Sequence, residues 1–275
     1  NPNDIDPKNL PGMQALMSKY GVNFAERPYW MVDDDKDLPR IYKVGFTSLT
    51  MVDDFIREIS ANPLVEYAEK VPLCVSSFTT NDPSGPVLSG SQWFLNTINA
   101  QNAWNIQNGT STIVVAVVDN AFQITHTDLS GNIYVNAGEI PGNSIDDDGN
   151  GYIDDVNGYD VGDNDNGVAP PNTSFNHGTH CAGIVGARTN NGIGISAIGF
   201  NLKILPVKAT ANAAGPTAVT NGYGGIVYAV RTKARVISCS WGGTVSAASD
   251  QSVINYAWGK GCVVICAAAN DGNSI

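Results

Sequence analysis

Beyond residue 92, short runs of apolar residues alternate with segments whose apolar positions recur every three or four residues. Short continuous apolar runs predict strands that are buried on both faces, and the recurring segments predict helices that cover them. The predicted strands are 113–118, 204–208, 236–240 and 262–268, and the predicted helices are 180–186, 224–231 and 250–260. This alternation predicts an α/β domain in which a parallel sheet lies between two helical layers.

Residues 1–73 carry a smaller pattern of their own. Segments of helical spacing and of strand-like alternation occur, in chain order, at 10–20, 41–46, 50–59 and 65–71. Thr50 is the predicted N-cap of the second helix, because its hydroxyl can accept a backbone N–H bond. Strand, helix and strand in succession predict a small α/β unit of the βαβ type. The polar, Ser-, Thr-, Pro- and Gly-rich segment 74–90 predicts a linker.

The composition is that of a globular protein: 275 residues, 43% hydrophobic and 15% charged. No apolar run approaches the roughly 20 residues of a membrane helix, so we expect no membrane partner. The net charge of −11 argues against nucleic acid as a partner. The opening Asn-Pro-Asn-Asp lacks a basic and an apolar leader region, so we expect no signal peptide within these residues.

The five cysteines are odd in number and show no C-x-x-C spacing. Cys239, Cys262 and Cys266 lie inside apolar runs, which predicts buried free thiols rather than a disulfide framework.

Three polar residues stand where a parallel sheet gathers its chemistry, beyond the carboxyl ends of strands. Asp119 follows the strand 113–118, His177 precedes the small residues of a helix start, and Asn270 ends the strand region 262–268. An aspartate can orient a histidine that acts as a general base, and an asparagine amide can stabilise an oxyanion. Taken singly, each residue has an ordinary alternative as a turn, cap or structural residue.

The order and settings of these residues resemble those of the subtilisin-like serine proteases, and of thermitase-like members in particular. The segments that carry the resemblance are Val114-Val-Ala-Val-Val-Asp119, Asn176-His-Gly-Thr-His-Cys-Ala-Gly183 and Ala267-Ala-Ala-Asn270. The resemblance covers 81–270. It implies a three-layer subtilisin-like fold that hydrolyses peptide bonds of polypeptide substrates, in a secreted or cell-surface protein. It makes Asp119 and His177 catalytic, Asn270 an oxyanion donor, and Ser240, Trp241 and Gly242 a strand that pairs with the substrate backbone.

The catalytic triad of this family consists of Asp, His and Ser, and the serine is the member that we do not find in this sequence. The family's Gly-Thr-Ser-Met-Ala motif does not occur in the 275 residues, and Ser274 lacks that setting. The resemblance therefore implies that 81–275 is a catalytic domain without the C-terminal part that carries the nucleophile, which a complementary C-terminal chain would supply. This chain alone would be inactive. The alternatives are a catalytically dead binding module and a propeptide-type inhibitor.

The family resemblance also assigns the first segment of the chain. Residues 1–73 resemble the inhibitory propeptide of these zymogens, which occupies the cleft of its own catalytic domain. The tail would be 72–80, and 74–80 would be a linker that contains the processing site.

Besides the missing serine, two departures from the family pattern concern the site itself. Asn120-Ala121 follows the aspartate where the family has Thr or Ser and then Gly, and Ala269 replaces a Gly before the asparagine. Trp241 is predicted to narrow or flatten the pocket beside the cleaved bond.

An acidic stretch predicts calcium binding. The oxygen-bearing residues Asp146, Asp148, Asn150 and Asp154, with the carbonyl of Tyr152, follow the spacing of an EF-hand loop. Position twelve is Asn157 rather than Glu, so a true EF-hand is not expected, and an acidic turn is the alternative.

The family resemblance implies two further calcium sites, each built from hard oxygen ligands. One would use Asp82, Asp128 and Asn191 with the carbonyls of Arg188, Ile193 and Ile195, and the other Asp160, Asp163 and Asp165.

Overall fold

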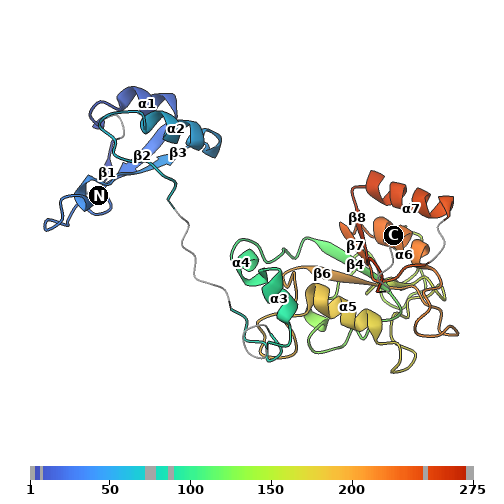
Figure 1. Ribbon diagram of the computed structural model, residues 1–275. Coiled ribbons are helices and arrows are strands. Elements are labelled where there is room, and N and C mark those ends of the chain that lie inside the picture. The colour runs from blue at the N-terminus through green and yellow to red at the C-terminus, as the bar shows by residue number, and fades with distance from the viewer. Residues whose placement is uncertain (1–3, 7–8, 72–78, 86–89, 244–246, 271–275) are drawn as a thin grey trace. The chain divides into compact units, whose positions relative to one another are not determined.

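The computed structural model describes residues 4–6, 9–71, 79–85, 90–243 and 247–270. The chain divides into two compact units, Asn1–Val75 and Ser76–Ile275 (Figure 1). Among the described residues, no helix has the length and apolar character that crossing a bilayer requires.

The first unit is a three-stranded antiparallel sheet with two short helices. In chain order its elements are β1 (Asp4–Ile5), α1 (Gln14–Lys19), β2 (Val22–Glu26), η2 (Leu38–Arg40), β3 (Lys43–Phe46), η3 (Leu49–Met51) and α2 (Val52–Ile59), and the strand order is β1-β2-β3. Met17, Tyr20 and Phe55 bring the helices and the sheet into one core. This core buries the apolar faces that the helical spacing predicted.

Two predictions for this unit were wrong. Segment 65–71 forms no strand, and β3 pairs antiparallel with β2. The unit is therefore not of the βαβ type. Thr50 is not the N-cap, because η3 continues directly into α2 and the cap falls on Met51, which makes no side-chain cap bond.

The second unit contains a five-stranded, wholly parallel sheet. Its elements are α3 (Trp93–Thr97), α4 (Ala100–Trp104), β4 (Val114–Asp119), η4 (Ser130–Asn132), β5 (Tyr159–Asp160), α5 (His177–Gly186), β6 (Lys203–Lys208), α6 (Gly222–Arg231), β7 (Val236–Cys239), α7 (Ala248–Gly259) and β8 (Val263–Cys266). The strand order is β5-β6-β4-β7-β8. The predicted parallel α/β sheet is confirmed.

Helices cover both faces of this sheet, α5 on one and α6 and α7 on the other (Figure 1). Successive side chains of β4 divide between them, because strand side chains alternate. Val115 and Val117 pack in the core cluster that includes Ala182 of α5, whereas Ala116 and Val118 pack with Ile226 of α6.

The strand register aligns the residues that end each strand. Asp119 of β4 is level with Lys208 of β6, and Cys239 of β7 is level with Val118 of β4 and Cys266 of β8. The segments that follow β4, β7 and β8 therefore leave the same edge of the sheet, where ligands of open α/β sheets bind.

The described cysteines, Cys181, Cys239, Cys262 and Cys266, are all free. Cys239 and Cys262 are buried as predicted, but Cys266 is exposed, because no other described strand pairs with β8 on its outer side.

Candidate active site

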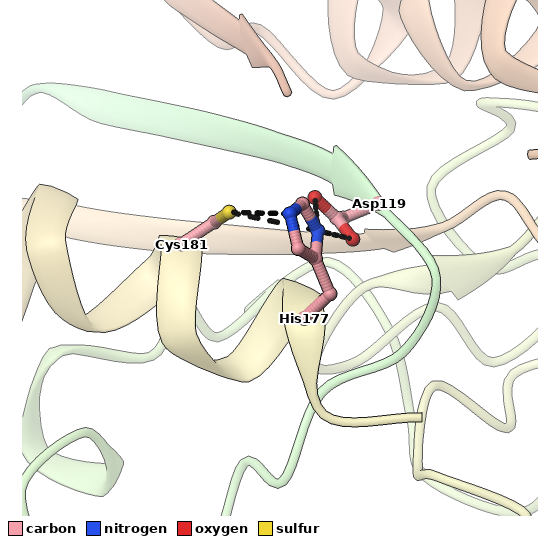
Figure 2. Close-up of side chains that lie close together, drawn as sticks. All are labelled: Asp119, His177 and Cys181. Atoms are coloured by element: carbon pink, nitrogen blue, oxygen red, sulfur yellow. Dashed lines mark hydrogen bonds and ion pairs between the residues drawn. The ribbon is translucent and has the colours of Figure 1, made fainter. Parts of the chain in front are cut away.

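The site is centred on a pair between Asp119 and His177. Asp119 ends β4 and is 2% exposed, and His177 is the first residue of α5. The Nδ1 atom of His177 lies 2.8 Å from Oδ1 and 3.0 Å from Oδ2 of Asp119 (Figure 2). Because an ionised carboxylate only accepts hydrogen bonds, this contact places the imidazole proton on Nδ1 and leaves Nε2 as the basic nitrogen. The sequence predicted both residues but placed the helix start three residues late.

A glycine allows the helix to approach the sheet this closely. A Cβ atom on Gly178 would lie 2.6 Å from the carbonyl oxygen of Ala121 and 2.9 Å from Cβ of Asp119. Any larger residue would therefore push the first turn of α5, and His177 with it, away from Asp119.

Cys181 lies one helical turn after His177, with Sγ 3.7 Å from Nδ1 and 3.9 Å from Nε2 of the imidazole (Figure 2). Burial raises the pKa of the Cys181 thiol to about 11, and a hydrogen bond with Ser240 partly opposes this shift. The thiol is therefore protonated at neutral pH, whereas a cysteine nucleophile must be a thiolate. Asp119, His177 and Cys181 could together hold a metal ion, but a metal on Nδ1 would replace the hydrogen bond to Asp119.

The predicted substrate strand continues from β7 through Ser240, Trp241 and Gly242. The indole Nε1 of Trp241 donates to the carbonyl of Val118 at 2.9 Å. Its ring lies edge-on to Tyr223 and covers Gly222, where a Cβ atom would come within 2.5 Å of the indole. These contacts anchor the segment to β4 and α6.

Asn270 follows β8 at the same edge of the sheet and is exposed. The residue before it, Ala269, has a φ of +66°, in the left-handed region that disfavours a side chain. Ser274 and most of the predicted tail 72–80 lie outside the described residues.

The first predicted calcium cluster is assembled around two buried aspartates. Asp82 is fully buried and accepts bonds from the backbone N–H groups of Asn190 and Asn191. Asp128 accepts from Nδ2 of Asn191 and from the N–H of Ile195. The Arg188 N–H donates to the Asp128 carbonyl, and the Ile193 N–H donates to Oδ1 of Asn191, so all six predicted residues lie in one network.

The loop 146–154 is acidic as predicted, but a different set of carboxylates converges. Oxygens of Glu139, Asp148 and Asp155 all lie within 4.8 Å of one another. Burial raises the pKa of the Asp155 carboxyl, which also accepts bonds from Asn136, Asn150 and Tyr228.

Two of the predicted ligands of this loop accept backbone N–H groups and do not belong to this converging set. Asp146 accepts from the N–H groups of 150 and 151, and Asp154 accepts from those of 142–144. Tyr152 donates its own N–H to Oδ1 of Asn150. The sequence missed Glu139 and Asp155 because they fall outside the loop spacing; the only signal was that Asp155 directly follows Asp154.

In the third predicted calcium cluster, that of Asp160, Asp163 and Asp165, a lysine side chain supplies a positive charge. The ammonium of Lys208 contacts Oδ2 of Asp160, and both side chains are fully buried. Oδ2 of Asp163 lies 3.6 Å from the same ammonium. Asp165 belongs to this cluster through its backbone: the N–H of each of Asp160 and Asp165 donates to the carbonyl of the other. Lys208 was not predicted as a partner of these carboxylates, because in the sequence it only ends the apolar strand β6.

Comparison with known proteins identifies the family of this chain. Residues 110–275 match the model of the subtilase family, and the chain belongs to that family of serine proteases. Thermitase of Thermoactinomyces vulgaris is 39% identical over 194 residues, and the thermophilic serine proteinase of Bacillus sp. (strain AK1) is 34% identical over 223. An extracellular protease of Xanthomonas campestris pv. campestris is 32% identical over 243 residues.

A solved structure shows the same fold. A protease of Pseudoalteromonas arctica PAMC 21717 matches with a TM-score of 0.52 at 28% identity, over 70% of this chain and 60% of that chain.

The matches cover much of this chain but only part of each relative. The match with thermitase covers 70% of this chain and 59% of thermitase. The matches with the Bacillus and Xanthomonas enzymes each cover 81% of this chain, but only 48% and 40% of those enzymes, respectively.

Proposed function

We propose that this chain is part of a secreted, calcium-dependent subtilisin-like serine endopeptidase whose nucleophilic serine lies outside the 275 residues. The observation that carries the proposal is the hydrogen bond between Asp119 and His177 at the carboxyl edge of the sheet. It leaves a basic Nε2 on a side chain that is 57% exposed and can receive a proton from an incoming hydroxyl. The extracellular relative supports secretion.

The reaction follows from these positions. The serine oxygen attacks the substrate carbonyl while Nε2 of His177 takes the hydroxyl proton. Asp119 holds the Nδ1–H and stabilises the imidazolium. The side-chain amide of Asn270 donates to the developing oxyanion. His177 then returns the proton to the leaving amine, and water hydrolyses the acyl-enzyme in the same way.

We assign substrate binding to the segment Ser240–Gly242. A polypeptide substrate would add a strand beside it, which gives affinity through main-chain hydrogen bonds. Trp241 keeps this segment against β4 through its bond to the Val118 carbonyl. We also propose that its bulk restricts the neighbouring side-chain pocket.

The first unit would act as the propeptide, with its tail in the cleft of the catalytic unit. A complementary C-terminal chain would complete the triad, and we propose that it covers the outer side of β8. Val263 and Ile265 of this strand are 42% and 53% exposed, which leaves apolar surface for such a segment.

Calcium fits two of the three acidic clusters well. Glu139, Asp148 and Asp155 bring three carboxylates together, and like charges at such distances favour a divalent cation with oxygen ligands. Asp82 and Asp128, both buried, offer the same chemistry with the oxygens of Asn191 and nearby carbonyls. In the third cluster the ammonium of Lys208 already lies next to Asp160 and Asp163. We therefore propose that this cluster is the weakest of the three calcium sites.

Substitution of Asp119 in the completed enzyme tests the proposal. Asp119→Asn keeps the shape but favours the wrong tautomer of His177, and we expect kcat on a peptide substrate to fall by about 10⁴-fold. Asp147→Asn, in an exposed part of the acidic loop, serves as the control and should leave kcat unchanged. Full activity of Asp119→Asn would reject the assigned roles.

A further inference from the structure

Asn120 stands directly after the catalytic aspartate and is only 2% exposed. Its backbone N–H donates to Oδ1 of Asp119 at 2.7 Å. Its side-chain Oδ1 accepts the N–H of Gly178 at 3.0 Å, and its Nδ2 donates to the carbonyl of Pro216 at 2.8 Å. One side chain thus contacts the start of α5 and the loop 209–221 between β6 and α6.

The bond to Gly178 replaces a helix cap. The first N–H groups of a helix have no partner within it, and α5 begins after Asn176, whose side chain makes no cap bond. Gly178 is buried, so its N–H would be costly to leave unpaired. Asn120 supplies the missing acceptor from a distant part of the chain.

Three contacts in parallel join the segment 119–123 to the first turn of α5. Asp119 binds His177, Asn120 binds Gly178, and the N–H of Gln123 donates to Oγ1 of Thr179 at 3.0 Å. Asn120 is buried, and both the oxygen and the nitrogen of its side-chain amide are bonded. Its contact with Gly178 therefore constrains the neighbouring contacts, Asp119 with His177 and Gln123 with Thr179.

We propose that Asn120 is a positioning residue that sets the approach of His177 to Asp119 and couples it, through Pro216, to the loop 209–221. A serine or threonine at this position would be one bond shorter and would carry no N–H₂ group to donate to the carbonyl of Pro216. The proposed role therefore requires the side-chain amide of asparagine. Its effect on the reaction rests on the proposed function.

Nuclear magnetic resonance of the 275-residue chain tests the positioning without catalysis. In Asn120→Ala we expect the Gly178 N–H to exchange about tenfold faster, because its acceptor is gone. We also expect the low-field Nδ1–H signal of His177 to weaken, as the Nε2–H tautomer gains population. Asn120→Asp keeps the acceptor and should retain the protection of Gly178, which also provides a readout if the alanine variant does not fold.

The matched control is Asn132→Ala. Asn132 also bridges backbone groups, but at the other end of α5, where Nδ2 donates to the carbonyls of Gly186 and Phe200. It should leave the Gly178 exchange and the His177 signal unchanged. Equal effects of Asn120→Ala and Asn132→Ala, or no effect of Asn120→Ala, would overturn the proposal.

In the completed enzyme, Asn120→Ala should lower kcat by about 10- to 100-fold, with KM within about twofold, because misplacement of the base affects the chemical step more than binding. A loss confined to KM would contradict a positioning role. If the completed wild-type protein shows no activity, the proposed function fails, and the resonance measurements still decide the role of Asn120.

Discussion

At the scale of single residues, Ala269 has the most unusual backbone of the site. Its φ of +66° is a conformation that costs a non-glycine residue about 1–2 kcal/mol. It directly precedes Asn270, the proposed oxyanion donor. Backbone strain of this kind is commonly retained at active sites.

Replacement of Ala269 by glycine should relieve this strain. We expect Ala269→Gly to raise the free energy of unfolding by about 0.5–1 kcal/mol, since the relief exceeds the extra entropy of glycine in the unfolded chain. Urea unfolding followed by circular dichroism measures the change. Ala268→Gly, without a positive φ, is the control and should destabilise. A loss of stability in Ala269→Gly would contradict the conclusion that the backbone of Ala269 is strained.

The sequence predicted that Asp119 and His177 would act as a pair, and they do contact each other, but it did not predict all of their partners. Asp119 and His177 stand in recognisable settings, next to an apolar run and before Gly178. The contacts of Asn120 depend on Gly178 and Pro216, which only the folded chain brings near. Glu139 meets Asp148 and Asp155 for the same reason, so the spacing within the loop favoured Asp146 and Asp154 instead.

At the scale of elements, continuous apolar runs were reliable where strands are buried on both faces. β4, β6 and β7 appear within one or two residues of the predicted bounds. The first unit was predicted less well, because β1 has only two residues and β2 alternates weakly. Segment 65–71 alternates in sequence but exposes Tyr67, so its pattern reflects one-sided packing without strand pairing.

The end of β6 provides a prediction at this scale. Lys208→Met should leave Asp160 as a buried, unpaired carboxylate and destabilise the protein by about 3–5 kcal/mol. The double variant Lys208→Met, Asp160→Asn should recover most of this loss. Thermal or urea unfolding of the two variants measures both values.

The control for this experiment lies on the same strand. The ammonium of Lys203 donates to the carbonyl of Gly131 at an exposed position, so Lys203→Met should cost less than about 1 kcal/mol. An equally small effect of Lys208→Met would show that its ion pair with Asp160 is unimportant.

At the scale of the whole molecule, calcium should couple the acidic clusters to stability. Ligand that binds only the folded state stabilises it, by about 2.7 kcal/mol at a concentration of 100 Kd. We therefore expect the melting temperature of the chain to fall when calcium is chelated. Calorimetry with and without chelator measures the difference.

Two variants identify the ligands of the 146–154 loop. Asp155→Asn should reduce the calcium-dependent gain in melting temperature, because Asp155 converges with Glu139 and Asp148. Asp146→Asn should retain the gain, because the carboxylate of Asp146 does not belong to the group formed by Glu139, Asp148 and Asp155. The opposite result would restore the ligand set that the sequence spacing predicted.

We propose above that Asp119 and His177 activate a serine supplied from outside these residues. Intact mass spectrometry after treatment with a fluorophosphonate probe in calcium buffer tests it most directly, on the chain together with its complementary C-terminal segment. We expect one adduct, on a serine of that segment, and we expect it to disappear in His177→Ala. No adduct on the folded, calcium-bound protein, or an equal adduct in His177→Ala, would contradict it.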